Sequence, residues 1–172
     1  TGDYAFEIRT WVARLTGERG RANGTIQARL AKLAADPNPS VRLAVATAAR
    51  QFVSGDLTVN TPAPAGAADA DVGEIITRVA YASKGGTDPL IPFVTWMAAE
   101  PLVRDDPQDA FDWLAEHGPN TLPLSGHLAH KVARRVCDLP GVDGLNQAVK
   151  FVEALPADSP LVVHSLRGIA AG

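Results

Sequence analysis

The feature that most constrains the fold is the spacing of apolar residues, which recur three or four positions apart along nearly the whole chain. One such stripe consists of Val72, Ile75, Ile76 and Val79. This period places the apolar side chains on one face of a helix. No segment of five or more residues alternates apolar and polar positions, as a strand with one buried face does. The chain is therefore expected to be all-α.

The expected helix starts carry a recurring pair, a short polar residue followed by proline, as in Asn38-Pro39 and Asp106-Pro107. The polar side chain can cap free backbone N–H groups, and proline suits the first helical position. Gly17 is expected at a helix end. Together with the periodicity, these signals predict about nine helices, over residues 4–16, 25–35, 39–54, 71–83, 89–99, 107–117, 125–138, 143–155 and 160–171.

One stretch interrupts the helical pattern, residues 54–71, which are rich in Ala, Pro, Gly and Asp. It contains no periodic apolar residues. We expect a long surface loop inside a single domain that covers residues 1–172, and not a domain linker; the alternative is a disordered segment without a functional role.

The chain also contains an internal similarity. Ile8-Arg9 and Val41-Arg42 lie 33 residues apart, each pair near the start of an expected helix. The segment from Leu30 to Ala49 resembles a HEAT repeat of the phycobilisome-lyase type, through the residues Leu30, Leu33, Asp36, Pro37, Val41, Arg42, Ala44 and Ala48. The resemblance implies an α-solenoid of stacked antiparallel helix pairs, because one pair cannot bury both of its faces.

Five residues are expected to have structural roles in this repeat. Asp36 can accept N–H groups of the turn, and Arg42 can donate to carbonyls or carboxylates of the adjacent repeat. Pro37 belongs to the turn, whereas Val41 and Arg9 occupy the repeated positions at helix starts. The alternative is that Asp36 and Arg42 form a ligand site.

A longer resemblance follows from the order of four segments: residues 88–103, the Phe-x-Trp-Leu pattern at 111–114, residues 122–126 and residues 131–138. In this order they resemble the HEAT-repeat region of large exported bacterial haem-binding proteins described as membrane-bound dehydrogenases. The resemblance implies a periplasmic or exported location and neighbouring propeller and cytochrome-like domains. This chain has a single cysteine and no CxxCH motif, so it cannot attach c-type haem and no cofactor is expected in it.

The polar residues form no recognisable catalytic or metal motif. His127 and His130 share a helical spacing, but a metal site needs further ligands, and a solvent-facing pair is the expectation. Cys137 is expected to be a small buried apolar residue. An acidic cluster around residue 106 is explained by a helix start, where negative charge is favourable. No catalytic, metal or cofactor residue is therefore predicted.

Charge is unevenly distributed along the chain. Residues 1–50 hold eight Lys or Arg against four Asp or Glu, whereas residues 51–130 hold three against eleven. The acidic middle argues against a continuous track for phosphates, so nucleic acid is disfavoured as a partner. Trp11 is expected in the core. The candidate interaction surface consists of Trp96, Trp113, Arg134 and Arg135, although the spacing of both tryptophans also fits core positions.

The expected function is that of a non-catalytic scaffold or docking domain, which binds a protein partner or adjacent domains of a longer redox protein. The alternative is a HEAT-fold enzyme or nucleic-acid-binding module of the alkylpurine DNA glycosylase type, which would combine exposed aromatic residues with a partly buried carboxylate. No apolar run approaches the roughly 20 residues that a membrane-spanning helix needs, so no membrane insertion is expected.

Overall fold

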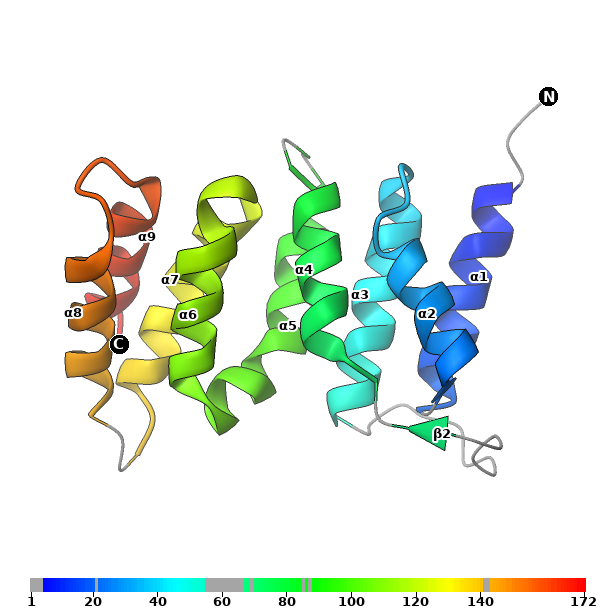
Figure 1. The fold of residues 1–172 in the computed structure, drawn as a ribbon, viewed down its shortest axis with the longest axis horizontal. Coiled ribbons are helices and arrows are strands. Elements are labelled where there is room, and N and C mark those ends of the chain that lie inside the picture. Colours follow the sequence, from blue (N-terminus) through cyan, green and yellow to red (C-terminus); the bar gives the residue numbers. More distant parts are fainter. Residues whose placement is uncertain are drawn as a thin grey trace. The chain divides into compact units, whose positions relative to one another are not determined.

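The computed structural model describes residues 5–20, 22–54, 67–68, 70–84, 86, 88–140 and 143–172. These residues form nine α-helices, which confirms the all-α prediction (Figure 1). The helices are α1 (Ala5–Glu18), α2 (Gly24–Leu33), α3 (Pro39–Ser54), α4 (Val72–Ala82), α5 (Leu90–Asp105), α6 (Pro107–His117), α7 (Leu124–Cys137), α8 (Gly144–Ala154) and α9 (Pro160–Ile169).

The helix starts use the capping chemistry that the sequence predicts. Asp106 accepts the N–H of Asp109 at 3.0 Å ahead of α6. Asn23 accepts the N–H of Ile26 at 3.0 Å ahead of α2. Each of these bonds satisfies a backbone donor that has no partner within its own helix, which favours a helix start at that position.

One helix runs further than predicted. The sequence places its end near residue 99, but α5 continues to Asp105 and contains Pro101. Proline in a helix interior removes one hydrogen bond and costs stability. Beyond it, Val103 is only 2% exposed, and its burial favours continuation of the helix.

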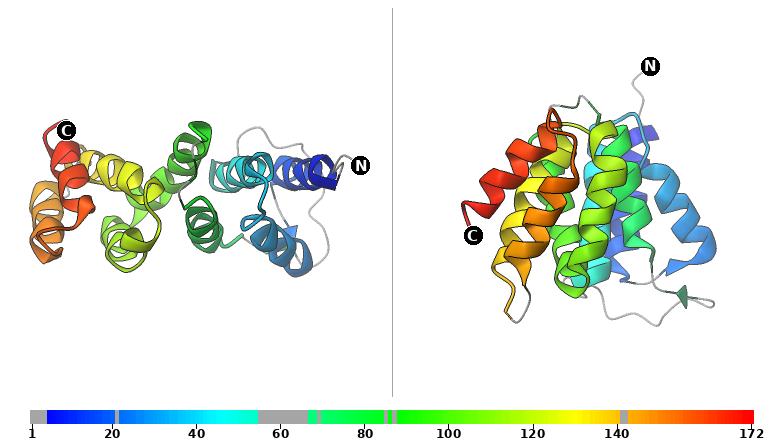
Figure 2. Two further views of the ribbon diagram at one scale, coloured as in Figure 1. Left: turned by 90° about the horizontal axis from the view of Figure 1, so that it is seen from above. Right: turned by 60° about the vertical axis from the view of Figure 1, so that its left-hand side comes forward.

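Contacts within the chain divide it into two compact units. The first covers residues 1–83 and 87–99, and therefore α1 to α4 with most of α5. In this unit α1 packs on α3 while α2 contacts α4, so that the helices form two layers (Figure 2). Two short strands, β1 (Ala22–Asn23) and β2 (Ala67–Ala68), pair antiparallel. Most of the loop predicted over 54–71 lies outside the described residues.

The contact between α1 and α3 is close because small residues face it. Ala13 and Gly17 are the buried residues of α1. A Cβ atom added to Gly17 would lie 2.6 Å from the Cα of Ala48 and would also meet the side-chain oxygen of Gln51. Gly17 lies one residue before Glu18, the last residue of α1, which agrees with the predicted helix end, and it is also a packing position. The turn follows at Gly20, whose φ of 65° favours glycine.

The second unit covers residues 84–86 and 100–172. It contains the end of α5, α6, the 3₁₀ turn η1 (Gly118–Asn120), and α7 to α9. Here α7 packs on α9 and α6 contacts α8, again in two layers (Figure 2). The rings of Phe111 and Phe151 stack at a centroid distance of 4.8 Å between α6 and α8. Gly168 permits the close approach of α9 to α7, since an added Cβ would meet the carbonyl oxygen of His130.

The single domain predicted over residues 1–172 stays a prediction. Each unit buries its own apolar residues, for example Val45 at 0% exposure in the first and Leu161 at 0% in the second. Within the part of the chain that the structure describes, none of the helices combines the length and the apolar character that crossing a bilayer requires.

Candidate functional site

The outer face of α1 carries a stripe of large apolar side chains that the fold leaves in solvent. Ile8 is 66% exposed, Trp11 57%, Val12 38% and Leu15 52%. Their spacing places them on one side of the helix along about two turns. The expectation that Trp11 belongs to the core is therefore wrong. The physical reason is that α1 packs on α3 through Ala13 and Gly17, which turns its large residues outward.

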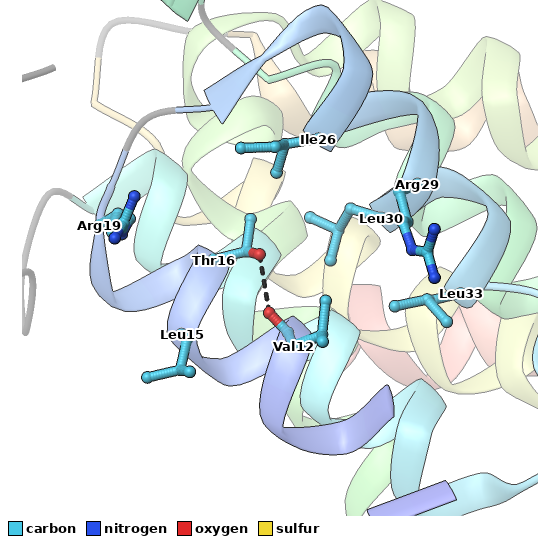
Figure 3. A pocket seen from close by; sticks show the side chains of 8 residues that line it. All are labelled: Val12, Leu15, Thr16, Arg19, Ile26, Arg29, Leu30 and Leu33. Atoms are coloured by element: carbon cyan, nitrogen blue, oxygen red, sulfur yellow. Dashed lines mark hydrogen bonds between the residues drawn. The ribbon is translucent and has the colours of Figure 1, made fainter. Parts of the chain in front are cut away.

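Beside this stripe, α1 and α2 enclose a groove of about 270 Å³, which we call the α1–α2 groove (Figure 3). Its walls are mainly aliphatic. Thr16, the one hydroxyl residue among the described residues of the lining, donates a hydrogen bond to the carbonyl oxygen of Val12 at 2.7 Å. The groove is lined by Val12, Leu15, Thr16, Arg19, Ile26, Arg29, Leu30 and Leu33. Because Val12 and Leu15 belong to both features, the stripe and the groove form one surface.

Positive charge borders this apolar surface. Arg19 and Arg29 lie on opposite sides of the aliphatic cluster in Figure 3, and both residues are exposed. No ion pair involves either guanidinium within the described residues. Arg14 lies over the ring of Trp11, with its Cζ 5.7 Å from the ring centroid. None of the described residues that line the groove is acidic.

The turn between α2 and α3 gathers four of the five predicted repeat residues into one network. Arg9 donates to the carboxylate of Asp36 at 2.6 and 3.3 Å, and the N–H of Asn38 donates to the same carboxylate at 2.9 Å. Arg42 donates to the carbonyl oxygens of Asp36 and Pro37 at 2.7 and 3.0 Å. Asp36 and Arg42 are each 7% exposed, so these bonds satisfy charges that burial would otherwise destabilise.

Arg42 also connects this turn to the next helix, because its Nε donates to Ser83 Oγ at 3.2 Å. Val41, the fifth repeat residue, is fully buried. The hydrogen-bonding capacity of the Asp36 carboxylate is thus engaged by Arg9 and the turn. These hydrogen bonds connect α1, the turn and the end of α4, and they fix the orientation of α1.

The residues predicted as an interaction surface are divided between the two units, and that surface stays a prediction. Trp96 belongs to the first unit, whereas Trp113, Arg134 and Arg135 belong to the second. Both tryptophans are half-buried, and Arg134 is exposed. Arg135 donates to Glu100 at 2.7 Å in an ion pair. Ile8, Val12 and Leu15 were not predicted as surface residues, although the four-residue spacing of Ala13 and Gly17 marks a second face on which α1 could pack.

The histidines of α7 are not the solvent-facing pair that the sequence predicts. His127 and His130 are half-buried, and the Nε2 atom of His127 is buried with no hydrogen-bond partner among the described residues. Burial lowers the pKa of both imidazoles, and the nearby Lys131 lowers each pKa further. His164 of α9 lies against Gly126, and its charge also lowers the pKa of both imidazoles. These effects favour neutral imidazoles at this helix contact.

The other polar candidates have ordinary surroundings. Burial raises the pKa of the Cys137 thiol, and Asp138 adds to the increase, so the unreactive thiol form is favoured. In the acidic cluster, Asp106 caps α6, while Asp105 contacts Arg104 at 3.1 Å. Among the described residues, no three His, Cys, Asp or Glu side chains are grouped so that they could hold a metal ion.

Comparison of this chain with protein-family models, curated proteins and solved structures found no match. The surface formed by the α1 stripe and the α1–α2 groove therefore has to be interpreted from its own chemistry.

Proposed function

We propose that this chain is a non-catalytic helical-repeat scaffold that docks a protein partner, or an adjacent domain of a longer protein, on the surface formed by the α1 stripe and the α1–α2 groove. The observation that carries the proposal is the exposure of Ile8, Trp11 and Leu15 along one helix face. Large contiguous apolar surfaces on a folded protein mark interaction sites.

The helix contacts support the scaffold part of the proposal. In both units, helices that are two apart in the chain contact each other. The pairs are α1 with α3 and α2 with α4 in the first unit, and α7 with α9 and α6 with α8 in the second. Stacked HEAT-like pairs have this pattern, because each repeat contacts only its neighbours. The resemblance of residues 30–49 to a HEAT repeat and the network around Asp36 and Arg42 agree with it. We extend this to an α-solenoid within a larger redox protein, as the longer resemblance implies.

The shape of the groove supports docking of a protein segment over binding of a metabolite. A volume of about 270 Å³ falls below the roughly 300–1,000 Å³ of typical small-molecule pockets. Its aliphatic walls offer few of the converging polar groups that orient a small ligand. It suits a few apolar side chains presented by a partner, with the α1 stripe providing the rest of the contact.

Site-specific photo-crosslinking tests this proposal. Benzoylphenylalanine in place of Leu15 should give adducts with defined proteins, identified by mass spectrometry. The same group in place of Tyr81, which is 44% exposed on α4, is the matched control and should give none of these adducts. Ile8→Ser with Trp11→Ser should abolish the Leu15 adducts. Equal labelling from both positions would contradict docking at α1.

A second candidate, a nucleic-acid-binding module of the glycosylase type, is favoured by one observation. Trp11 is exposed beside Arg14, and an exposed ring next to a cation can stack on a base. Against it, the groove walls are aliphatic, and the buried carboxylate of Asp36 already accepts bonds from Arg9 and Asn38. Binding of duplex DNA that weakens steeply with salt and is lost in Trp11→Ala would favour this candidate.

A further inference from the structure

We propose that the occupant of the α1 surface is an amphipathic helix whose apolar face is flanked by acidic residues. This inference rests on the proposed docking function and deepens it by naming the chemistry of the partner. It follows from three properties of the surface: its helical geometry, its aliphatic floor, and the arginines at its edges, which form no ion pair with another described residue.

The geometry selects a helix as the docking element. The stripe residues Ile8, Trp11 and Leu15 follow one another along the axis of α1, and the groove runs between two helices beside them. An amphipathic helix binds such a surface with residues at the same i, i+3, i+4 and i+7 spacing, because both partners then present ridges of equal period. An extended strand would need free backbone groups at a sheet edge, and α1 and α2 offer helical backbone instead.

The positive charges at the groove favour a partner helix with acidic residues at the margins of its apolar face. Arg19 and Arg29 border the groove on opposite sides, and no ion pair compensates either one within the described residues. Arg14 adds a third positive charge beside Trp11. A helix that carries Glu or Asp on both margins of its apolar face would meet these guanidinium groups in bidentate pairs. A helix with lysine margins would face like charges, which costs affinity.

Three synthetic peptides of about five helical turns test the inference. The first has a leucine face flanked by glutamates, the second has the same face flanked by lysines, and the third is a scrambled version of the first. Fluorescence anisotropy should give about tenfold tighter binding for the acidic amphipathic peptide than for the lysine peptide, since each exposed ion pair contributes modestly. The scrambled peptide should not bind measurably.

Charge reversal at the groove is the decisive step. Arg19→Glu with Arg29→Glu should weaken the acidic peptide about tenfold and strengthen the lysine peptide. The matched control reverses two exposed cations of the second unit, Lys150→Glu with Arg167→Glu, and should leave both affinities within twofold. Far-ultraviolet circular dichroism of each variant checks that the helices are retained.

The remaining outcomes separate this inference from the docking function. Equal affinity of both amphipathic peptides, lost in Leu15→Ser but unchanged by the arginine reversals, would overturn the acidic preference and leave docking in place. Self-association of the chain that Leu15→Ser abolishes, without peptide binding, would identify a second copy as the occupant and overturn the inference. Binding of duplex DNA in place of any peptide would overturn both proposals.

Discussion

At the scale of single residues, small side chains decide which face of a helix is buried. Gly17 brings the backbone of α1 against Ala48 of α3, and a side chain larger than hydrogen has no room there. Gly24, the first residue of α2, has no heavy atom within 4 Å of an added Cβ. Substitution of these two glycines by alanine therefore separates two effects: the loss of packing space at Gly17 and the loss of conformational freedom alone at Gly24.

Gly17→Ala is expected to lower the free energy of unfolding by about 1–3 kcal/mol, the range of an overpacked contact. The reason is that Ala48 presents backbone atoms at this contact, which cannot rotate away. Gly24→Ala should be neutral or slightly stabilising, because alanine is the better helix former. Urea unfolding of both variants measures the difference, and an equal effect at both positions would contradict the close α1–α3 contact.

At the scale of helices, both units use glycine at the contact between their most closely packed pair. Gly17 lies between α1 and α3, and Gly168 and Gly126 lie between α9 and α7. The second contact differs because it encloses titratable groups. His127, His130 and His164 lie at or beside it, together with Lys131 and Arg134 of α7. Protonation of His127 or His130 would add positive charge to a cluster that already has two cations, Lys131 and Arg134.

This cluster makes stability depend on pH. The folded protein holds the pKa of His127 and His130 below 6.5, so the unfolded chain binds these protons more readily. The free energy of unfolding should therefore be constant above about pH 7.5 and should decrease as the pH falls through the ordinary imidazole pKa of about 6.5. Urea unfolding across this range measures the slope.

The double variant His127→Gln, His130→Gln separates this cluster from other titrations. It should unfold with a flatter pH dependence than the wild-type chain, because the imidazoles that take up the protons are absent. An unchanged slope in the double variant would show that other groups cause the dependence.

At the scale of the whole molecule, the contacts fall into two units with separate buried residues. Stability in stacked-helix proteins is roughly a sum of local terms, so a local defect should remain in its own unit. The Arg9–Asp36 pair belongs to the first unit and connects α1 to the turn before α3. Removal of this ion pair is therefore a local defect that is confined to the first unit.

Asp36→Ala should lower the stability of the first unit by about 2 kcal/mol, because it removes charge-assisted hydrogen bonds to a buried carboxylate. Native-state hydrogen exchange should show lower protection in α1 and α3, with α7 and α9 little changed. Asp112→Ala, which removes an exposed carboxylate of α6, is the control and should leave protection unaltered. An equal loss of protection in all the described helices would indicate one cooperative unit.

The sequence by itself determined the all-α class and the helix bounds. The predicted bounds agree with the structure to within two residues, except at the end of α5, which continues past Pro101. The reason is that the signals are local. Apolar period, capping residues and proline at first turns act within a few residues of each helix, so they can be recognised without knowledge of neighbours.

Only the tertiary structure decided which face of each helix is buried and which groups meet. On α1 the sequence offers two faces, one large and apolar and one small, and burial of the small face against α3 depends on a contact between residues 31 positions apart, Gly17 and Ala48. The exposed Trp11, the arginines around the groove and the half-buried histidines all follow from such contacts. The energies of these contacts depend on residues that are far apart in the sequence, so no local sequence pattern predicts them.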